Sequence, residues 1–186
     1  MNRKVFLAIL LVVMAAAVES YSQITYIGAA GHYGTAIKEF GVGANAIYTI
    51  NEKIDIAPGL VYYFPHKYDY SDGYIQNTWW SVNVDGHYIP VETSFFHAYG
   101  LMGLSFTSVE VKEDYLIKGT QPLKDRKTTL ELGLNIGGGI QFKLAEKIAP
   151  FAEAKYTLGE ADQLVFSLGI LFRIKEDKVR ENTEDF

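Results

Sequence analysis

The sequence contains no cysteine, which excludes disulfide bonds, thiol catalysis, zinc–thiolate sites and a lipidated N-terminal cysteine. It has no stripe of basic residues and carries a formal net charge of −5, so nucleic acid is not an expected partner. After the N-terminus, no apolar run reaches the roughly 20 residues that a membrane-spanning helix needs. What is abundant is tyrosine (13), phenylalanine (11) and glycine (17), in a chain of 186 residues that suffices for one domain.

The N-terminus has the layout of a secretory signal peptide. A positive segment, Asn2–Lys4, precedes the unbroken apolar run Val5–Val18, and small and polar residues follow. We predict cleavage after Ser22, with Ser20 at the −3 position; cleavage after Ala17 or Ser20 is the alternative. An uncleaved anchor is disfavoured because the run is shorter than a spanning helix.

The segment Leu130–Lys143 alternates between two kinds of residue, which predicts a β-strand with one apolar and one polar face. The apolar face carries Leu130, Leu132, Leu134, Ile136, Ile140 and Phe142, and the polar face carries Glu131, Asn135, Gln141 and Lys143. The strand is longer than the about five or six residues usual in soluble proteins. A tilted strand that crosses a membrane needs roughly 9–11 residues.

The same pattern recurs along the chain and predicts eight strands. They are Ile24–Tyr33, Phe40–Ile50, Ile54–Phe64, Trp79–Ile89, Ser94–Phe106, Leu130–Lys143, Ile148–Thr157 and Leu164–Ile174. The hairpin Phe40–Phe64 also resembles Leu134–Tyr156, which indicates internal repetition. The connections after the second, fourth and sixth strands are short, whereas two others, Pro65–Thr78 and Thr107–Lys127, are long. The facing of the first strand, rich in glycine and alanine, stays ambiguous.

Aromatic residues on the apolar faces gather at the two ends of the strands, around an aliphatic middle. One belt comprises Tyr48, Tyr88, Phe96, Phe142 and Phe172, and the other comprises Phe40, Tyr62, Phe64, Trp80, Phe106, Tyr156 and Phe166. Two aromatic belts and alternating short and long connections are typical of transmembrane barrels. We therefore predict an all-β fold: an eight-stranded antiparallel up-and-down transmembrane β-barrel at residues 23–174, after a signal peptide at 1–22 and before a charged tail at 175–186.

On these features the chain resembles the small eight-stranded outer-membrane β-barrels, the superfamily of the OmpA transmembrane domain and OmpX. The Ser22-Gln23 junction also resembles secreted proteins of the Bacteroidota. The resemblance implies a non-enzymatic protein of the bacterial outer membrane that supports membrane integrity and displays external loops for binding or adhesion, without an open pore. Its implied partners are outer-membrane lipid, the barrel assembly machinery and an external ligand or host surface, with no cofactor.

Two groups of residues are candidate sites. Charged and imidazole side chains on the polar faces should pair inside the lumen, which in an eight-stranded barrel is just wide enough for side chains. This predicted lumen network comprises Asp55, Asp85, His87, His97, Glu131, Lys143, Glu153, Lys155 and Arg173. The second candidate is an external aromatic binding loop at Tyr68, Tyr70, Tyr74 and Trp79, unless these residues simply continue the interfacial belt. No catalytic or metal site is expected: His32, His66, Asp69 and Asp72 lack recognisable ligand spacing.

Two other functional classes remain open. A lipid-modifying enzyme would need a serine beside a histidine, for which His97 with Ser94 or Ser105 is a poor match. A soluble periplasmic barrel that binds an apolar ligand would instead carry its apolar faces inside.

Overall fold

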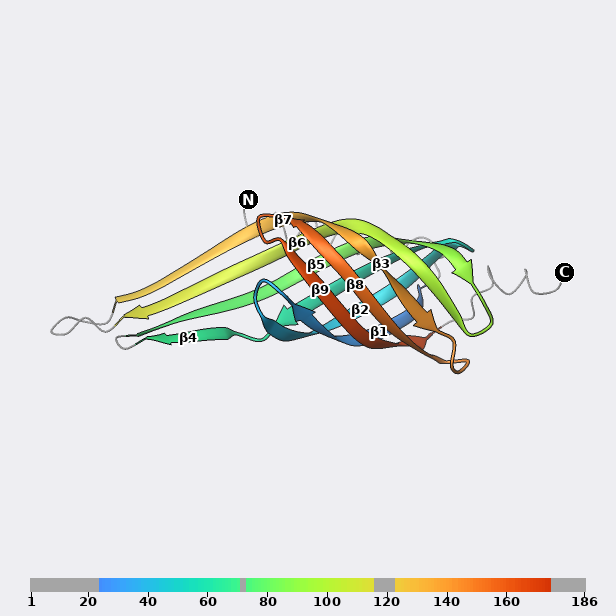
Figure 1. Cartoon of the computed structure of the whole chain (residues 1–186), viewed down its shortest axis with the longest axis horizontal. Coiled ribbons are helices and arrows are strands. Elements are labelled where there is room, and N and C mark those ends of the chain that lie inside the picture. The colour runs from blue at the N-terminus through green and yellow to red at the C-terminus, as the bar shows by residue number, and fades with distance from the viewer. Residues whose placement is uncertain (1–23, 71–72, 116–122, 175–186) are drawn as a thin grey trace.

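The computed structural model describes residues 24–70, 73–115 and 123–174, and within them nine strands form one antiparallel sheet (Figure 1). The strands are β1 (Ile24–Gly34), β2 (Glu39–Asn51), β3 (Ile54–Tyr63), β4 (His66–Tyr70), β5 (Gly73–Glu92), β6 (Phe96–Tyr115), β7 (Leu123–Phe142), β8 (Ile148–Gly159) and β9 (Gln163–Arg173). The predicted signal peptide and charged tail lie outside the described residues. No helix in the described ranges is long and apolar enough to cross a membrane.

Eight of these strands close into a barrel. The sheet runs in the order β3-β2-β1-β9-β8-β7-β6-β5-β4, and β3 also pairs with β5 along Ile54–Tyr62. β1 pairs with both β2 and β9, so the first and last strands of the barrel meet. β4 pairs with β5 beyond the barrel wall. The predicted fold class, an eight-stranded antiparallel barrel, is confirmed.

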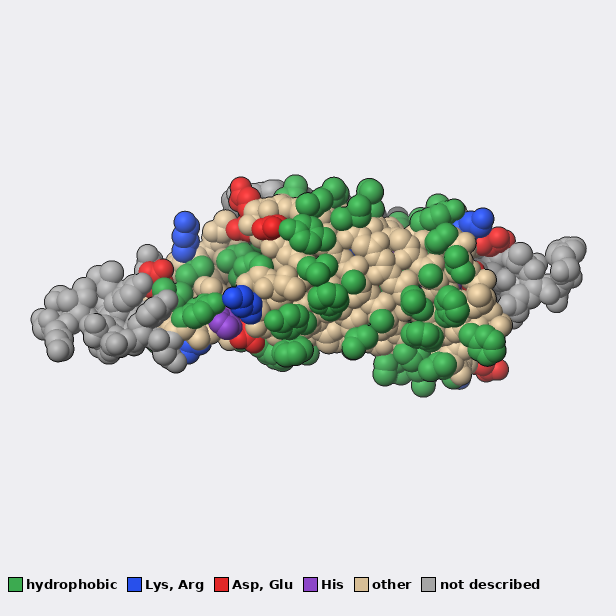
Figure 2. Space-filling model, viewed as in Figure 1, with side chains coloured by type: hydrophobic (Ala, Val, Ile, Leu, Met, Phe, Trp, Pro, Cys, Tyr) green, Lys and Arg blue, Asp and Glu red, His purple; other side chains and the backbone are tan. Residues whose placement is uncertain are grey.

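The barrel turns its large apolar side chains outward and its polar side chains inward, as the alternation predicted. On β7, Leu132 is 61% exposed whereas Asn135 is completely buried. Apolar side chains are spread over the outer surface of the barrel wall (Figure 2). Monomeric soluble proteins rarely expose so many large apolar side chains. The assignment of faces from sequence is thus confirmed along Leu130–Phe142.

Inward glycines make room for the aromatic rings that fill the lumen. Tyr99 lies directly opposite Gly139 in the β6–β7 register, and a Cβ atom on Gly139 would lie 2.5 Å from the Tyr99 ring. Phe151 and Gly169 repeat this arrangement between β8 and β9. Glycine is needed at these positions because an aromatic ring occupies the space of the missing side chain.

The two long connections were wrongly predicted as loops. Most of Pro65–Thr78 forms β4 and the start of β5, and much of Thr107–Lys127 belongs to β6 and β7. The inter-strand pairing continues past the barrel as far as Tyr115 opposite Gly73 and Leu123. We call this part of the sheet the extension: residues 66–70, 73–78, 110–115 and 123–128. It projects from one side of the barrel mouth, while β1–β2 and β8–β9 end there in short turns (Figure 1).

Neither face of the extension lines the lumen. Its sequence therefore shows no regular alternation of apolar and polar residues. The opposite end of the barrel carries the three short turns that follow β2, β5 and β7. We call it the short-turn end.

Candidate functional site

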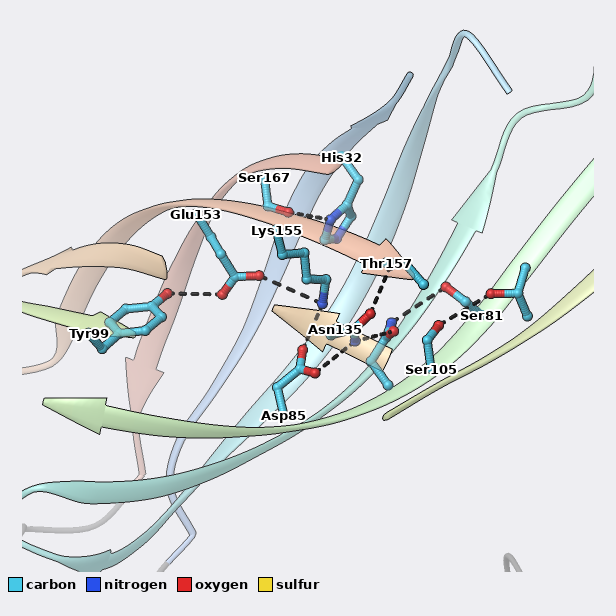
Figure 3. A network of polar contacts seen from close by, with 12 residues as sticks. His32, Ser81, Asp85, Tyr99, Ser105, Asn135, Glu153, Lys155, Thr157 and Ser167 are labelled. Atoms are coloured by element: carbon cyan, nitrogen blue, oxygen red, sulfur yellow. Dashed lines mark hydrogen bonds and ion pairs between the residues drawn. The ribbon is translucent and has the colours of Figure 1, made fainter. Parts of the chain in front are cut away.

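The centre of the lumen holds an ion pair that crosses between distant strands. The Lys155 ammonium on β8 donates to Asp85 Oδ2 on β5 at 2.7 Å, and its Nζ atom lies 3.7 Å from Glu153 Oε1 (Figure 3). Asp85 and Lys155 are 3% and 7% exposed. Buried charges must be paired and hydrogen-bonded to be tolerated, and both conditions are met here.

Amide and hydroxyl groups extend this ion pair into a network. Asn135 Nδ2 donates to Asp85 Oδ1 at 2.7 Å and to Asn83 Oδ1 at 3.1 Å, while Thr157 Oγ1 donates to Asn135 Oδ1 at 2.8 Å. The Tyr99 hydroxyl donates to Glu153 Oε2 at 3.0 Å. The network therefore ties β5, β6, β7 and β8 together across the lumen (Figure 3).

Little free volume remains beside the network. A cavity of about 40 Å³ lies among Asn45, Asp85, Tyr99, Glu153 and Lys155, with further residues of both lumen walls around it. A buried water needs about 10–15 Å³ of such volume, so the cavity has room for about three waters. Beside the network, side chains leave room for water but not for larger solutes.

Several predicted members of the lumen network lie between its centre and the short-turn end. His87 stacks on Tyr99 with ring centroids 4.3 Å apart, and His97 lies 6.2 Å from the same ring. Asp55 is buried and lies opposite His87 in the β3–β5 register. The structure thus brings Asp55, His87 and His97 around one tyrosine that also contacts Glu153.

Three residues of the predicted lumen network lie at the ends of the barrel, away from the central network. Lys143 follows the last residue of β7, where its ammonium reaches Glu92 at 2.7 Å in a partly exposed pair. Arg173, the last residue of β9, donates to the Tyr26 hydroxyl from Nη2 at 2.8 Å. Glu131 lies toward the extension, and its buried Oε2 atom has no hydrogen-bond partner. Arg173 thus contacts a tyrosine that is buried inside the barrel, whereas Lys143 pairs at the rim.

Sequence reasoning missed a serine–histidine contact. His32, which lacks metal-ligand spacing in the sequence, points into the lumen, where Nδ1 lies 2.8 Å from Ser167 Oγ. The ambiguous facing of β1 hid this contact, and an irregularity between Ile24 and Tyr26 shifts the register of that strand. Among the residues that the structure describes, no carboxylate forms a hydrogen bond with the His32 ring, so this pair lacks the orienting third group of a catalytic triad.

The predicted aromatic binding loop does not form one surface. Tyr68 is exposed and contacts His66, and the Tyr74 ring holds the Lys67 ammonium at 4.4 Å from its centroid. Trp79, in contrast, points inward and packs against a cluster of Ile37, Val61 and Tyr63. Tyr70 lies in β4, and its side chain is outside the described part of the structure.

At the barrel mouth, His66 Nδ1 pairs with Glu39 Oε1 and joins the base of β4 to β2. Within the described ranges, no three His, Cys, Asp or Glu side chains gather in a way that could hold a metal ion.

Comparison with solved structures identifies the fold. The N-terminal β-barrel domain of Pseudomonas aeruginosa OprF matches with a TM-score of 0.52 at 19% identity, covering 81% of this chain and 98% of that one. Yersinia pestis Ail, the attachment invasion locus protein, matches with a TM-score of 0.54 at 16% identity, covering 82% and 97%. Neisserial surface protein A matches with a TM-score of 0.52 at 17% identity, covering 83% and 99%.

No family model and no curated protein matches the sequence. The structural matches nevertheless span nearly the whole length of the neighbouring barrels, and they agree with the closed sheet and the outward apolar band. This chain has the fold of the small eight-stranded outer-membrane β-barrels.

Proposed function

We propose that the protein is an integral protein of the bacterial outer membrane, held there by its barrel. The observation that carries this proposal is that apolar side chains lie outside and charged side chains inside, the reverse of a soluble protein. Leu132, Met102 and Leu168 are at least 60% exposed, while Asp85 and Lys155 are buried. Burial of apolar surface contributes about 25 cal/mol per Å², so an outer wall of this kind favours a hydrocarbon environment. Closure satisfies the backbone hydrogen bonds between strands, which a lipid-facing sheet requires.

The barrel is oriented with the extension outside the cell and the short-turn end in the periplasm, because outer-membrane barrels have short periplasmic turns. Partners inside the envelope are membrane lipid and the machinery that assembles such barrels. The C-terminal strand β9 presents Phe172 outward beside β1, where strand closure takes place.

Within the membrane the protein serves integrity and display rather than transport. The Lys155–Asp85 ion pair and its hydrogen-bonded neighbours occupy the lumen, so we expect no open pore. The extension carries the contact surface for an external ligand or host surface. Ail supports this second role, since that barrel is described as an attachment invasion locus protein and was also solved with the heparin analogue sucrose octasulfate.

A lipid-modifying activity is the second candidate, and the His32–Ser167 contact is the observation that favours it. Ser167 is buried and faces the lumen, away from the lipid that such an enzyme would attack. His97 is buried as well, and Ser105 Oγ lies 3.2 Å from Thr107 Oγ1 instead of beside an imidazole. We therefore propose that the protein is not an enzyme.

An apolar-ligand carrier is not supported, because the lumen is charged and its cavity is small.

The membrane proposal is tested by gel mobility and fractionation. A folded barrel should migrate differently before and after heating in detergent, and the protein should fractionate with the outer membrane. Recovery in the soluble fraction without detergent would contradict membrane insertion. Single-channel recording then tests the plugged lumen: we expect no stable, large conductance, and a persistent open level would refute it.

A further inference from the structure

A row of cationic side chains crosses the extension at one level. In the strand registers, Lys67 lies opposite Gln76, Gln76 opposite Lys112, and Lys112 opposite Arg126. The row therefore runs over β4, β5, β6 and β7 at right angles to the strands. Residues directly opposite in a sheet share one face, so the three cations point the same way. We call Lys67, Lys112 and Arg126 the cationic ladder.

The cationic ladder lies on the lipid-facing side of the wall. Gln76 and Arg126 are four residues from Trp80 and Leu130, and an even separation keeps side chains on the same face of a strand. Trp80 and Leu130 both lie opposite Ser108 and belong to the outward face of the barrel. The ladder therefore stands directly above the surface that contacts lipid.

The carboxylate of Glu110 pairs with two residues of the cationic ladder. Glu110 lies one outward position below Lys112 and forms ion pairs with Lys112, at 2.9 Å, and with Arg126. These hydrogen bonds hold the pKa of Glu110 below its ordinary value, so it stays ionised at neutral pH. The Lys112 and Arg126 side chains remain 42% and 64% exposed, so both can also contact an anion from outside.

The ladder stands slightly above the layer where head groups of lipids around the barrel would lie. Four residues of a strand tilted by about 40° rise roughly 10 Å, from about 3.3 Å per residue. Head groups add about 5–8 Å to each side of a hydrocarbon core of about 30 Å. Lysine and arginine stems can also bend down toward the interface. Phosphate groups of lipid molecules packed against the outer wall thus fall within reach of the ladder.

We propose that the cationic ladder binds the phosphate groups of an anionic glycolipid in the outer leaflet, and that it tethers this lipid to the outer wall of the barrel. The inference rests on the proposed membrane location and orientation. Arginine suits this ligand because its planar guanidinium can make two parallel hydrogen bonds to one phosphate. Charge on the ladder supplies affinity, and the apolar belt beneath, with Trp80 and Leu130, holds the acyl chains.

The test is a titration of the folded, detergent-solubilised protein with diphosphoryl lipid A, followed by intrinsic tryptophan fluorescence and by native mass spectrometry of bound lipid. A triple variant, Lys67→Gln, Lys112→Gln and Arg126→Gln, should bind at least about tenfold more weakly, since each cation near an anionic lipid surface contributes roughly a fivefold effect. Lipid A without phosphate groups should bind the wild type and the triple variant alike.

Three single variants test which face of the extension binds the lipid. Arg126→Gln should weaken binding, whereas Lys127→Gln should not, because the adjacent residue Lys127 points to the opposite face of β7. Glu110→Gln should tighten binding, since it removes a carboxylate that pairs with both Lys112 and Arg126. A loss of affinity and a gain of affinity in two folded variants cannot both come from misfolding.

Equal affinity of the wild type and the triple variant for diphosphoryl lipid A would overturn the proposal. So would equal effects of Arg126→Gln and Lys127→Gln, or tight binding of sucrose octasulfate without binding of lipid A, which would identify a soluble polyanion as the ligand. Heat-dependent gel mobility of every variant separates these outcomes from failure of the membrane proposal. If the variants fold as barrels and the wild type does not bind lipid A, only the proposal of lipid binding by the cationic ladder is refuted.

Discussion

Replacing Lys155 with methionine should destabilise the barrel strongly, because it removes the positive charge at the centre of the lumen. Asp85, only 3% exposed, would lose the ammonium 2.7 Å from its Oδ2 atom, and Glu153 would lose its nearest cation. Breaking a buried pair by removing one partner costs about 3–5 kcal/mol. Asn135 still donates to Asp85 Oδ1, so we expect the lower end of that range, about 3 kcal/mol.

Urea unfolding in lipid vesicles measures this cost, with Trp79 and Trp80 as fluorescent reporters in β5. Lys143→Met is the matched control, because Lys143 forms the partly exposed pair with Glu92, and such a pair is worth about 0–1 kcal/mol. The double variant Asp85→Asn with Lys155→Met should be more stable than Lys155→Met alone, because it leaves fewer uncompensated charges. The reasoning would be refuted if Lys155→Met and Lys143→Met had equal effects on the free energy of unfolding.

Three further changes test other parts of the account. Leu134→Arg, at an outward position near the middle of β7, should cost about 2–4 kcal/mol in vesicles, whereas Thr128→Arg on the extension should be close to neutral in the same unfolding assay. Gly139→Ala should cost about 1–3 kcal/mol because the new Cβ meets the Tyr99 ring, while Gly100→Ala, whose Cβ has no atom within 4 Å, should not; equal midpoints would contradict the packing. Ser167→Ala should leave the membrane lipid profile unchanged, and an altered profile in cells would revive the enzymatic alternative.

The facing of the barrel strands could be predicted from sequence because a barrel wall imposes a strict period of two. Leu134 and Asn135 are neighbours in the chain, yet the outer surface carries the apolar side chain and the lumen holds the polar one. The pattern vanishes where this requirement ends. In the extension, Lys112 and Val111 both lie outside the lumen, and the charges of that segment suggested a loop instead of a strand.

Individual lumen partners could not be predicted, because they depend on how strands distant in sequence are placed side by side. Lys155 and Asp85 are 70 residues apart and meet across the barrel. The inward position of both residues did indicate that such charges must pair, which is why both were candidates. Lys143 and Arg173 share the inward pattern. However, β7 ends at Phe142 and β9 ends at Arg173, so both side chains lie at the end of the barrel. His32 was missed because glycine and alanine on β1 do not distinguish its faces.

The measurement that tests the central claim most directly is a spin-label scan along β7 in a bilayer. The chain has no cysteine, so single substitutions at positions 132 to 136 place each label uniquely. We predict that labels at Leu132, Leu134 and Ile136 are accessible to oxygen dissolved in the hydrocarbon, and that labels at Gly133 and Asn135 are shielded from it. Two results would contradict a barrel that faces lipid with its apolar side. One is oxygen accessibility at Gly133 and Asn135 instead of at Leu132, Leu134 and Ile136, and the other is equal exposure of all five labels to a water-soluble relaxing agent.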